Sequence, residues 1–350
     1  MNLGKLVRDD IISLRDSKCL ASPKIMQIEI TNKCTLHCPQ CYKIPVNQQK
    51  SMSFADFKNH IDEAVQLGVR QISLLGGEPF ENEKIINMIE YASMCGLDVM
   101  VVTNGCRISN ETINYLKKYE KKLTLLVSLN GSTEEINRLS RDGYKLSIHV
   151  AQLLKKNNFS FGINWVARHD NVMDFENLVQ LSKDIGAKFV NVVANKITGN
   201  AEIVSPLSLD DYKHLIHIIR KEKDSHYITI QRCYDILLSQ VAKYPRSILS
   251  GCQAGISVCA ITLDNKYMPC LHLMYPEKFD SISEYWKLSK TLQKLRYKDG
   301  VNQGYCSDCN HNNNCYYCRA MSIESHNDFN SGLKGCGFKE VYKEYEIIEI

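Results

Sequence analysis

A strand-like segment followed by three cysteines reads Ile28-Glu29-Ile30-Thr31-Asn32-Lys33-Cys34-Thr35-Leu36-His37-Cys38-Pro39-Gln40-Cys41-Tyr42. The cysteines have a Cys-x3-Cys-x2-Cys spacing. Four thiolates would saturate a zinc ion or a four-iron cluster, whereas three leave one iron with an open position for a small-molecule ligand. The stretch therefore indicates a reactive iron–sulfur centre directly after a strand. A zinc ion that takes a distant fourth ligand is the structural alternative.

The composition is that of a globular protein. The 350 residues are 44% hydrophobic and 23% charged, and the net charge of +4 gives no electrostatic support for a nucleic-acid partner. The N-terminus lacks the apolar core of a signal peptide and no later run has membrane-spanning length, so we expect a cytoplasmic protein without a membrane partner. In that reducing compartment, 15 cysteines indicate metal ligation rather than disulfides.

Apolar runs alternate with amphipathic stretches from Lys24 to about Val193, which predicts repeated strand–helix units and a parallel sheet. Ser53 and Ser109 are candidate helix N-caps, and Gly68, Gly96 and Gly186 are candidate C-terminal stops. Six strands are too few for a closed eight-stranded barrel, so the fold class is α/β, a partial (β/α)6 TIM-like barrel. Candidate strands are 26–30, 71–75, 98–103, 123–129, 159–166 and 188–193, and candidate helices are 53–67, 83–95, 109–118, 144–156 and 172–185.

The sequence divides into five parts that differ in composition and in predicted secondary structure. After residue 251 short strands, cysteines and Asn-rich turns replace the strand–helix alternation, which predicts a small domain built around bound metal. The predicted parts are an N-terminal extension (1–22), the partial barrel (23–200), a helical linker (201–248), the cysteine-rich iron–sulfur domain (249–340) and a tail (341–350).

A glycine pair follows the second predicted strand in Leu74-Leu75-Gly76-Gly77-Glu78-Pro79-Phe80. Two residues without a β-carbon let the backbone approach a ligand, and Glu78 adds an acceptor; a simple turn is the alternative. Asn104 follows the third strand and Ser128 lies in the fourth. Arg141, with Arg138 as its rival, offers a planar, permanently charged donor for a carboxylate. Each of these residues lies after the C-terminal end of a strand or close to it, where parallel barrels carry their chemistry.

Together the three cysteines and the Gly-Gly-Glu-Pro segment resemble the radical SAM superfamily. The resemblance implies that the open iron chelates S-adenosylmethionine and that Gly76, Gly77, Glu78 and Pro79 contact its amino group. It also implies that Ser128 and Arg141 hold the ribose and carboxylate, with Asn104 in the same site. Two departures concern the cofactor: Asn130 replaces the usual aspartate, and Gln40 stands where an aromatic often covers the adenine, so we expect Tyr42 to substitute in part.

The C-terminal array closely resembles the SPASM domain, an auxiliary-cluster extension of many radical SAM enzymes. The resemblance implies two further four-iron clusters, three in all. Asn265 stands where glycine is usual, and asparagine also tolerates a left-handed turn. The gap before Cys318 is one residue short, and two structural zinc sites are the alternative reading of the array. The implied ligands are Cys252, Cys259, Cys270 and Cys318 for the first auxiliary cluster and Cys306, Cys309, Cys315 and Cys336 for the second.

Other cysteines and histidines receive structural roles. We expect Cys19, Cys95, Cys106 and Cys233 to be small buried hydrophobes. His37 and His272 are expected to be hydrogen-bonding or surface residues rather than ligands. Leu271 stands where sulfatase-maturing relatives tend to have an acid, which argues against that subfamily.

Family resemblance implies an oxidoreductase-type enzyme. It would cleave S-adenosylmethionine reductively and abstract hydrogen from a ribosomally made peptide, to form a thioether or carbon–carbon crosslink or to epimerise a residue. The implied electron donor is flavodoxin- or ferredoxin-like. Four cysteines suffice to saturate the first auxiliary cluster, so we hypothesise that it relays electrons and does not bind substrate.

About 25 residues precede the first strand, too few for a leader-peptide recognition domain of roughly 80 residues, so we expect a separate leader-binding protein or recognition by the barrel itself. One alternative is an enzyme that oxidises a small molecule or decarboxylates a tetrapyrrole side chain. The other is a non-catalytic zinc- or iron-binding interaction protein.

Overall fold

The computed structural model describes residues 11–14, 17–43, 47–196, 198, 207–222, 226–231, 251–296, 306–309, 317–326 and 332. Within this part of the chain, nine strands form one sheet in which each strand runs parallel to its neighbours except β11, which is antiparallel to β10. In sheet order the strands are β11 (Tyr267–Met268), β10 (Val258–Ile261), β3 (Ile25–Thr31), β4 (Gln71–Gly76), β5 (Asp98–Thr103), β6 (Leu123–Ser128), β7 (Phe161–Ala167), β8 (Phe189–Ala194) and β9 (Ile228–Ile230).

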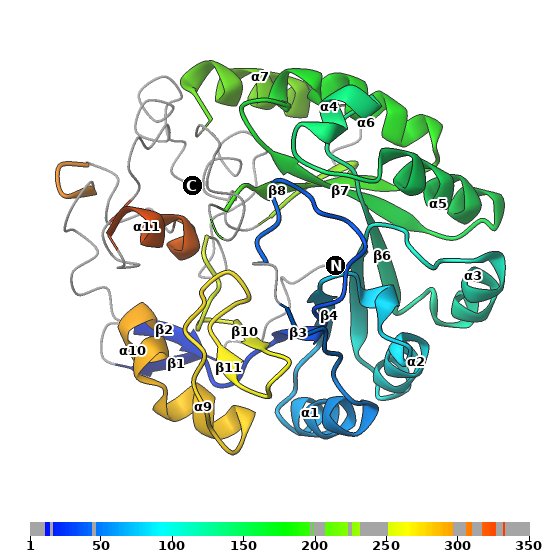
Figure 1. The fold of residues 1–350 in the computed structure, drawn as a ribbon. Helices are drawn as coiled ribbons and strands as arrows, with labels where there is room; N and C mark the ends of the chain where they lie inside the picture. The colour runs from blue at the N-terminus through cyan, green and yellow to red at the C-terminus, as the bar shows by residue number, and fades with distance from the viewer. Residues whose placement is uncertain are drawn as a thin grey trace.

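Helices cover the outside of the curved sheet (Figure 1). The longer ones are α1 (Phe54–Gln66), α2 (Ile85–Met94), α3 (Asn110–Leu116), α5 (Tyr144–Lys156), α6 (Phe175–Asp184) and α7 (Leu209–Lys221). Ser53 and Ser109 cap α1 and α3 as predicted, each accepting a backbone N–H three residues on, at 3.0 and 3.2 Å. The three predicted stops, Gly68, Gly96 and Gly186, have φ of 71°, 84° and 88°. None of the described helices is both long and apolar enough to span a membrane.

Shorter elements complete the described chain. Residues before the sheet form an antiparallel hairpin of β1 (Ile11–Leu14) and β2 (Ser17–Leu20), beside which α10 lies (Figure 1). The others are the single-turn helices η3 (Pro79–Glu81), η4 (Lys117–Tyr119) and η5 (Val172–Asp174), and the helices α4 (Glu134–Arg138), α9 (Ile282–Leu288), α10 (Lys290–Arg296) and α11 (Arg319–His326).

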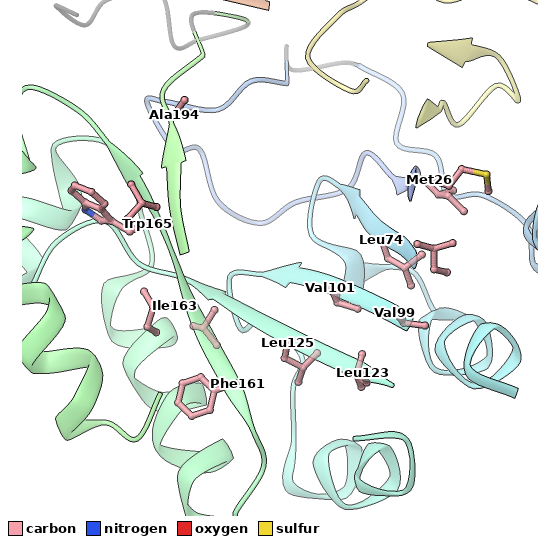
Figure 2. Packing of buried hydrophobic residues seen from close by; sticks show 14 of the residues in the cluster. Met26, Leu74, Val99, Val101, Leu123, Leu125, Phe161, Ile163, Trp165 and Ala194 are labelled. Atoms are coloured by element: carbon pink, nitrogen blue, oxygen red, sulfur yellow. The ribbon is translucent and has the colours of Figure 1, made fainter. Parts of the chain in front are cut away.

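Alternate side chains of each strand face opposite sides of the sheet. Val99, Leu125 and Ile163 belong to the core that packs against the helices, and Figure 2 shows this core across β5, β6 and β7. Their neighbours in the strands, such as Met100 and Asn164, line a pocket on the inner face instead. The helix-facing set is apolar, because helices exclude water from it, whereas the inner set includes polar residues.

Comparison with the sequence analysis confirms the partial barrel and extends it. The six predicted strands correspond to β3–β8, but β9 adds a strand within the segment predicted as a helical linker, where only α7 is helical among the described residues. At the other edge β10, assigned to the C-terminal domain, pairs with β3 in register Val258↔Ile25. An uncovered edge strand would expose unpaired N–H and C=O groups, and β9 and β10 satisfy them. The domain limits themselves stay a prediction.

Residues 251–296 also hold the N-terminal extension. Leu20 N donates to the Ile256 carbonyl at 3.0 Å, and the Trp286 indole donates to the Leu20 carbonyl at 2.9 Å. Lys24 N donates to the Ser257 carbonyl at 2.8 Å. The start of the barrel, the extension and the cysteine-rich segment are therefore joined by main-chain hydrogen bonds.

Candidate active site

A pocket of about 230 Å³ lies at the C-terminal ends of the strands. Its walls come from the cysteine loop after β3, from the inner faces of the strands, and from the segments that follow β8, β9 and β11. The predicted site residues that line it are Cys34, Cys38, Cys41, Tyr42, Gly76, Gly77, Glu78, Asn104, Ser128 and Arg141. The fold thus brings together ten of the eleven residues that the resemblance assigns to the first cluster and S-adenosylmethionine. Pro79 is buried at the start of η3 and does not line the pocket.

The glycine pair is required by the cysteine loop itself. A β-carbon on Gly76 would lie 2.1 Å from the Thr31 carbonyl oxygen, and one on Gly77 would lie 2.1 Å from the Lys33 carbonyl oxygen. The space instead admits two hydrogen bonds of 2.7 Å, from Gly77 N to Thr31 and from Glu78 N to Lys33. The sequence analysis expected the glycines to admit a ligand; in the structure they first admit the backbone that carries the cysteines.

A second set of hydrogen bonds fixes the far end of the loop. Gln40 N donates to the Ser140 carbonyl at 3.1 Å, and His37 N donates to the Asp142 carboxylate at 3.0 Å. Between these two anchors lies Arg141, whose side chain lines the pocket. The rival, Arg138, is exposed on α4 and does not line it. The loop and the cationic side chain are therefore positioned as one unit.

Glu78 is held rigidly at the pocket wall. Its side chain, only 1% exposed, accepts hydrogen bonds from the Thr103 hydroxyl at 2.6 Å, Asn104 N at 2.7 Å and Phe80 N at 3.2 Å. Burial raises the pKa of Glu78 to about 7, although these hydrogen bonds and Arg141 oppose the rise. The carboxylate is thus fixed in direction and titrates near neutrality.

Two buried polar atoms at the same end of the pocket lack hydrogen-bond partners: Arg141 Nε and Gln40 Oε1. A buried donor and a buried acceptor without partners are costly unless a ligand satisfies them. A ligand that carries both a carboxylate and an amino group, such as S-adenosylmethionine, can accept from Arg141 and donate to Glu78. The residues present therefore fit that molecule.

The three cysteines also fit a cluster. Burial raises the pKa of Cys34 to about 11 and raises that of Cys41, so both thiols give up protons when iron binds. Asn104 Nδ2 lies 3.7 Å from Cys34 Sγ, as a donor to the future thiolate. Within the described residues no three His, Cys, Asp or Glu side chains converge on one metal ion. A four-iron cluster does not require such convergence on one ion, because each thiolate binds a different iron atom.

Of the two residues discussed for the cofactor site, Tyr42 lines the pocket and Asn130 does not. Asn130 is fully buried outside the pocket, where its side chain donates to the Ser140 hydroxyl at 2.8 Å and accepts from Val166 N at 3.1 Å. It supports the segment before Arg141 and does not face the cofactor. Tyr42 does line the pocket, with its hydroxyl donating to the Gly76 carbonyl at 3.2 Å.

Comparison with known proteins agrees with this geometry. Residues 28–182 match the model of the radical SAM superfamily. These residues therefore form a radical SAM domain. An AdoMet-dependent heme synthase of Methanosarcina barkeri is 24% identical over 88% of this chain and 94% of its own. The antilisterial bacteriocin subtilosin biosynthesis protein AlbA of Bacillus subtilis is 23% identical over 80% of this chain and 61% of its own. Streptococcus suis SuiB bound to S-adenosylmethionine has the same fold, with a TM-score of 0.74, 18% identity, and coverage of 91% of this chain and 77% of SuiB.

None of the described cysteines of the two predicted auxiliary sets lines the pocket. Cys252, Cys270 and Cys318 lie close enough to one another that the charge of one raises the pKa of the next, on top of a larger effect of burial. Cys259 lies elsewhere: it is fully buried in the helix-facing core, and the charged groups that act on its pKa are Glu63 and Arg296. Its assignment as the fourth ligand stays a prediction.

The second predicted ligand set is only partly described. Cys306 and Cys309 are joined by a turn in which Cys309 N donates to the Cys306 carbonyl at 3.1 Å. Cys315 and Cys336 lie outside the described residues, as does Cys233. Asn265 has φ of 55°, which confirms the left-handed turn expected at the position where glycine is usual.

Cysteines outside the ligand sets differ from one another. Cys19 is buried as expected, and Cys95 is half-buried against the core. Cys106 is not a buried hydrophobe: it is half-exposed beside the cysteine loop, where its thiol donates to the Glu81 carboxylate at 3.3 Å and accepts from the Thr35 hydroxyl at 3.7 Å. The turn after β5 carries it there, because Cys106 N donates to the Asn104 side chain at 2.8 Å.

Sequence reasoning missed the polar wall across the pocket from Glu78. Asn164 and Asn191 on β7 and β8 line it and are hydrogen-bonded to each other at 2.8 Å. Lys196, Gln231 and His272 continue the wall beyond the strands. The two asparagines could have been found, since a polar residue within a predicted buried strand is informative. The other three depend on loops that only the fold brings together.

Proposed function

We propose that this radical SAM enzyme modifies a ribosomally made peptide after hydrogen abstraction. The observation that carries the proposal is one pocket that joins the three cysteines, Glu78 and the unpartnered Nε of Arg141 to a further polar wall. The first part suits S-adenosylmethionine, and we assign the polar wall to the substrate. Crosslinking or epimerisation of the peptide are the reactions that we expect.

Cys34, Cys38 and Cys41 would hold a four-iron cluster, which together with S-adenosylmethionine would supply the radical chemistry that removes hydrogen from an unactivated C–H bond. The chain's own residues orient the reactants. Glu78 would accept from the ammonium of the methionine part and Arg141 would donate to its carboxylate. Apolar inner-face residues, Met100, Val102 and Leu126 among them, exclude water from the floor of the pocket, which protects a reactive intermediate from side reactions.

The peptide substrate is supported by what the relatives are. The relative from Bacillus subtilis takes part in biosynthesis of the bacteriocin subtilosin, and a second relative is a PqqA peptide cyclase from Ruegeria pomeroyi. SuiB, which shares the fold, has been crystallised with its precursor peptide SuiA. A peptide-modifying role for this chain is an extension from those proteins.

The radical step is tested with protein reconstituted anaerobically with iron and sulfide. With S-adenosylmethionine and dithionite we expect 5′-deoxyadenosine and methionine, measured by liquid chromatography. A preparation that holds mainly zinc, or that releases no 5′-deoxyadenosine, would contradict the enzyme. The substrate is tested with the short peptides encoded beside the gene. We expect a mass loss of two hydrogens for a crosslink, or deuterium uptake from D2O for an epimerisation.

A second candidate is decarboxylation or oxidation of a tetrapyrrole side chain. It is favoured by the match to the heme synthase of Methanosarcina barkeri, which extends over 94% of that protein. The same reconstituted enzyme, offered a porphyrin with propionate side chains, would release carbon dioxide and leave the peptides unchanged.

The eight cysteines of the two predicted auxiliary sets would serve electron transfer. We propose that they hold two auxiliary four-iron clusters, which gives about twelve irons per chain together with the first cluster. The first auxiliary cluster would accept the electron that the substrate loses and pass it outward. A flavodoxin- or ferredoxin-like protein is the proposed electron donor. Iron analysis after reconstitution tests the number of clusters, and a spectral change of an auxiliary cluster on substrate addition would contradict the relay role.

A further inference from the structure

Lys196 is a buried cation in the pocket wall. It follows β8, its side chain lines the pocket, and only 6% of the residue is exposed. The ammonium donates to the Gln231 side-chain oxygen at 2.8 Å and to the Ala194 carbonyl at 3.3 Å. Both acceptors are neutral. Among the described residues no carboxylate lies within ion-pair distance of it, and the hydrogen-bond partners of its ammonium are these two dipoles.

Apart from the three cysteines, the described residues that line the pocket include more basic than acidic side chains. Arginine and lysine side chains line it at two positions, Arg141 and Lys196, whereas Glu78 is the one carboxylate among the described lining residues. Glu78 already accepts three hydrogen bonds at the other side, near Arg141. If Arg141 takes the carboxylate of S-adenosylmethionine, Lys196 is left without a counter-ion. A buried ammonium is stable only when it is well hydrogen-bonded or paired, so an anion is the complementary ligand.

The surroundings of Lys196 are built to hold it in place. Gln231 is fixed after β9 by a 2.8 Å bond from its N–H to the Val192 carbonyl, and its side-chain oxygen also accepts from Ala194 N at 3.3 Å. On the other side His272, whose Nδ1 is buried without a partner, packs edge-on to Tyr42 with ring centroids 4.8 Å apart. Burial lowers the pKa of His272 and the charge of Lys196 lowers it further, so the lysine acts on this ring.

We propose that Lys196, positioned by Gln231, binds a carboxylate of the substrate and so sets which end of the substrate enters the pocket. This inference rests on the proposed function, since it names the chemistry of the molecule that the radical acts on. A carboxylate is the shared feature of two sources. One is an acidic side chain or C-terminus of a peptide, and the other is a propionate of a tetrapyrrole.

The experiment compares matched ligands on matched variants of the reconstituted enzyme. The peptide arm uses a glutamate-containing pentapeptide and the same peptide with glutamine. The tetrapyrrole arm uses a porphyrin with free propionates and its methyl ester. Binding is measured by calorimetry for the peptides and by fluorescence quenching for the porphyrins. The variants are Lys196→Gln, which removes the charge, Lys196→Arg, which keeps it, and Lys188→Gln, which removes an exposed lysine just before the same strand.

We expect one carboxylate ligand to bind the unmodified enzyme and to lose about tenfold or more in affinity with Lys196→Gln. Lys196→Arg should recover part of the loss, Lys188→Gln should bind like the unmodified enzyme, and the neutral ligands should not respond to the charge. The arm that responds identifies the source of the carboxylate.

Equal binding of charged and neutral ligands, or no binding in either arm, would overturn the proposal. So would an equal loss of S-adenosylmethionine affinity in Lys196→Gln, because it would assign the lysine to the cofactor. Failure of the proposed function is distinguishable, since it would appear as an absence of 5′-deoxyadenosine from the unmodified enzyme while carboxylate binding remained.

Discussion

Cysteines occur in two environments in this chain. Cys34, Cys38 and Cys41 line a pocket that also contains unpartnered polar atoms. Cys252 and Cys318, in contrast, are buried in the core, outside any wall of that pocket, and Cys270 lies against the same core. A metal centre beside a pocket can meet a small molecule, whereas a centre enclosed by core residues exchanges only electrons easily. Position relative to the pocket, more than the number of thiols, therefore distinguishes the predicted reactive centre from the predicted auxiliary ones.

Removal of a pocket cysteine should have the largest effect, and it tests whether the two groups of cysteines bind iron independently. Cys38→Ser should reduce the release of 5′-deoxyadenosine to the rate without enzyme, because the first cluster loses a ligand, while about eight of twelve irons remain on the auxiliary sites. Chromatography and iron analysis measure the two quantities. Cys95→Ser, at the end of α2 and outside both ligand sets, is the control and should keep both. Loss of all iron in Cys38→Ser would show that the two environments are not independent.

A pair of variants tests which cysteines hold the first predicted auxiliary cluster. Cys252→Ser should lose about four irons per chain, because Cys252 lies with Cys270 and Cys318. Cys259→Ser should lose them as well, because the resemblance assigns Cys259 as the fourth ligand of the same cluster; retained iron would show that another group takes that place. Iron content and Mössbauer spectra measure the loss in both variants. If Cys259→Ser loses as much iron as Cys252→Ser, then Cys259 is the fourth ligand, as the sequence resemblance implies.

Two glycine substitutions test whether the cysteine loop needs the close backbone approach at Gly77. Gly77→Ala places a β-carbon 2.1 Å from the Lys33 carbonyl oxygen, and we expect it to cost about 3 kcal/mol of unfolding free energy and to impair the first cluster. Gly96→Ala meets no atom within 4 Å and should cost about 1 kcal/mol, from its positive φ alone. Thermal and urea unfolding measure the difference. Equal losses would mean that the loop does not need the close approach.

The smallest effect concerns pH. The pKa of Glu78 is about 7, above that of an ordinary glutamate, so its carboxyl takes up a proton as the pH falls below 7 and no longer attracts an ammonium. The dissociation constant of S-adenosylmethionine should therefore rise about tenfold from pH 8 to pH 6, measured by equilibrium dialysis. Glu78→Gln should bind more weakly and show a flatter profile. If the dissociation constant of that variant changed with pH as much as that of the unmodified enzyme, the pH dependence would belong to another group.

Much of the fold followed from the sequence, because the six central strands are short apolar runs between capped helices. Their limits differ from the predicted ones by two residues or fewer, and Ser53 and Ser109 cap as expected. The pocket residues from Cys34 to Arg141 were also predictable, since each follows a strand end in chain order. These features depend on local chemistry and on the rule that parallel strands present their C-terminal ends together.

What the sequence did not reveal depends on which face a residue occupies. On β10, Cys259 and Ile261 face the helix-side core while Ala260 packs with Tyr42 and Leu271, and spacing between cysteines does not encode that alternation. Likewise Lys196 is one of many lysines in the sequence. Only its place between β8 and Gln231 distinguishes it from the exposed ones.

The pairing of β10 with β3 has a consequence for synthesis of the protein. The two strands are separated by about 230 residues, yet Val258 lies opposite Ile25. At ribosomal speeds, one edge of β3 waits roughly 10 to 50 s for its partner. During that interval the nascent barrel exposes a strand edge next to the cysteine loop, and iron delivery before its closure would meet a half-formed site. Chaperone occupancy on stalled ribosomes would therefore be highest before residue 261 emerges.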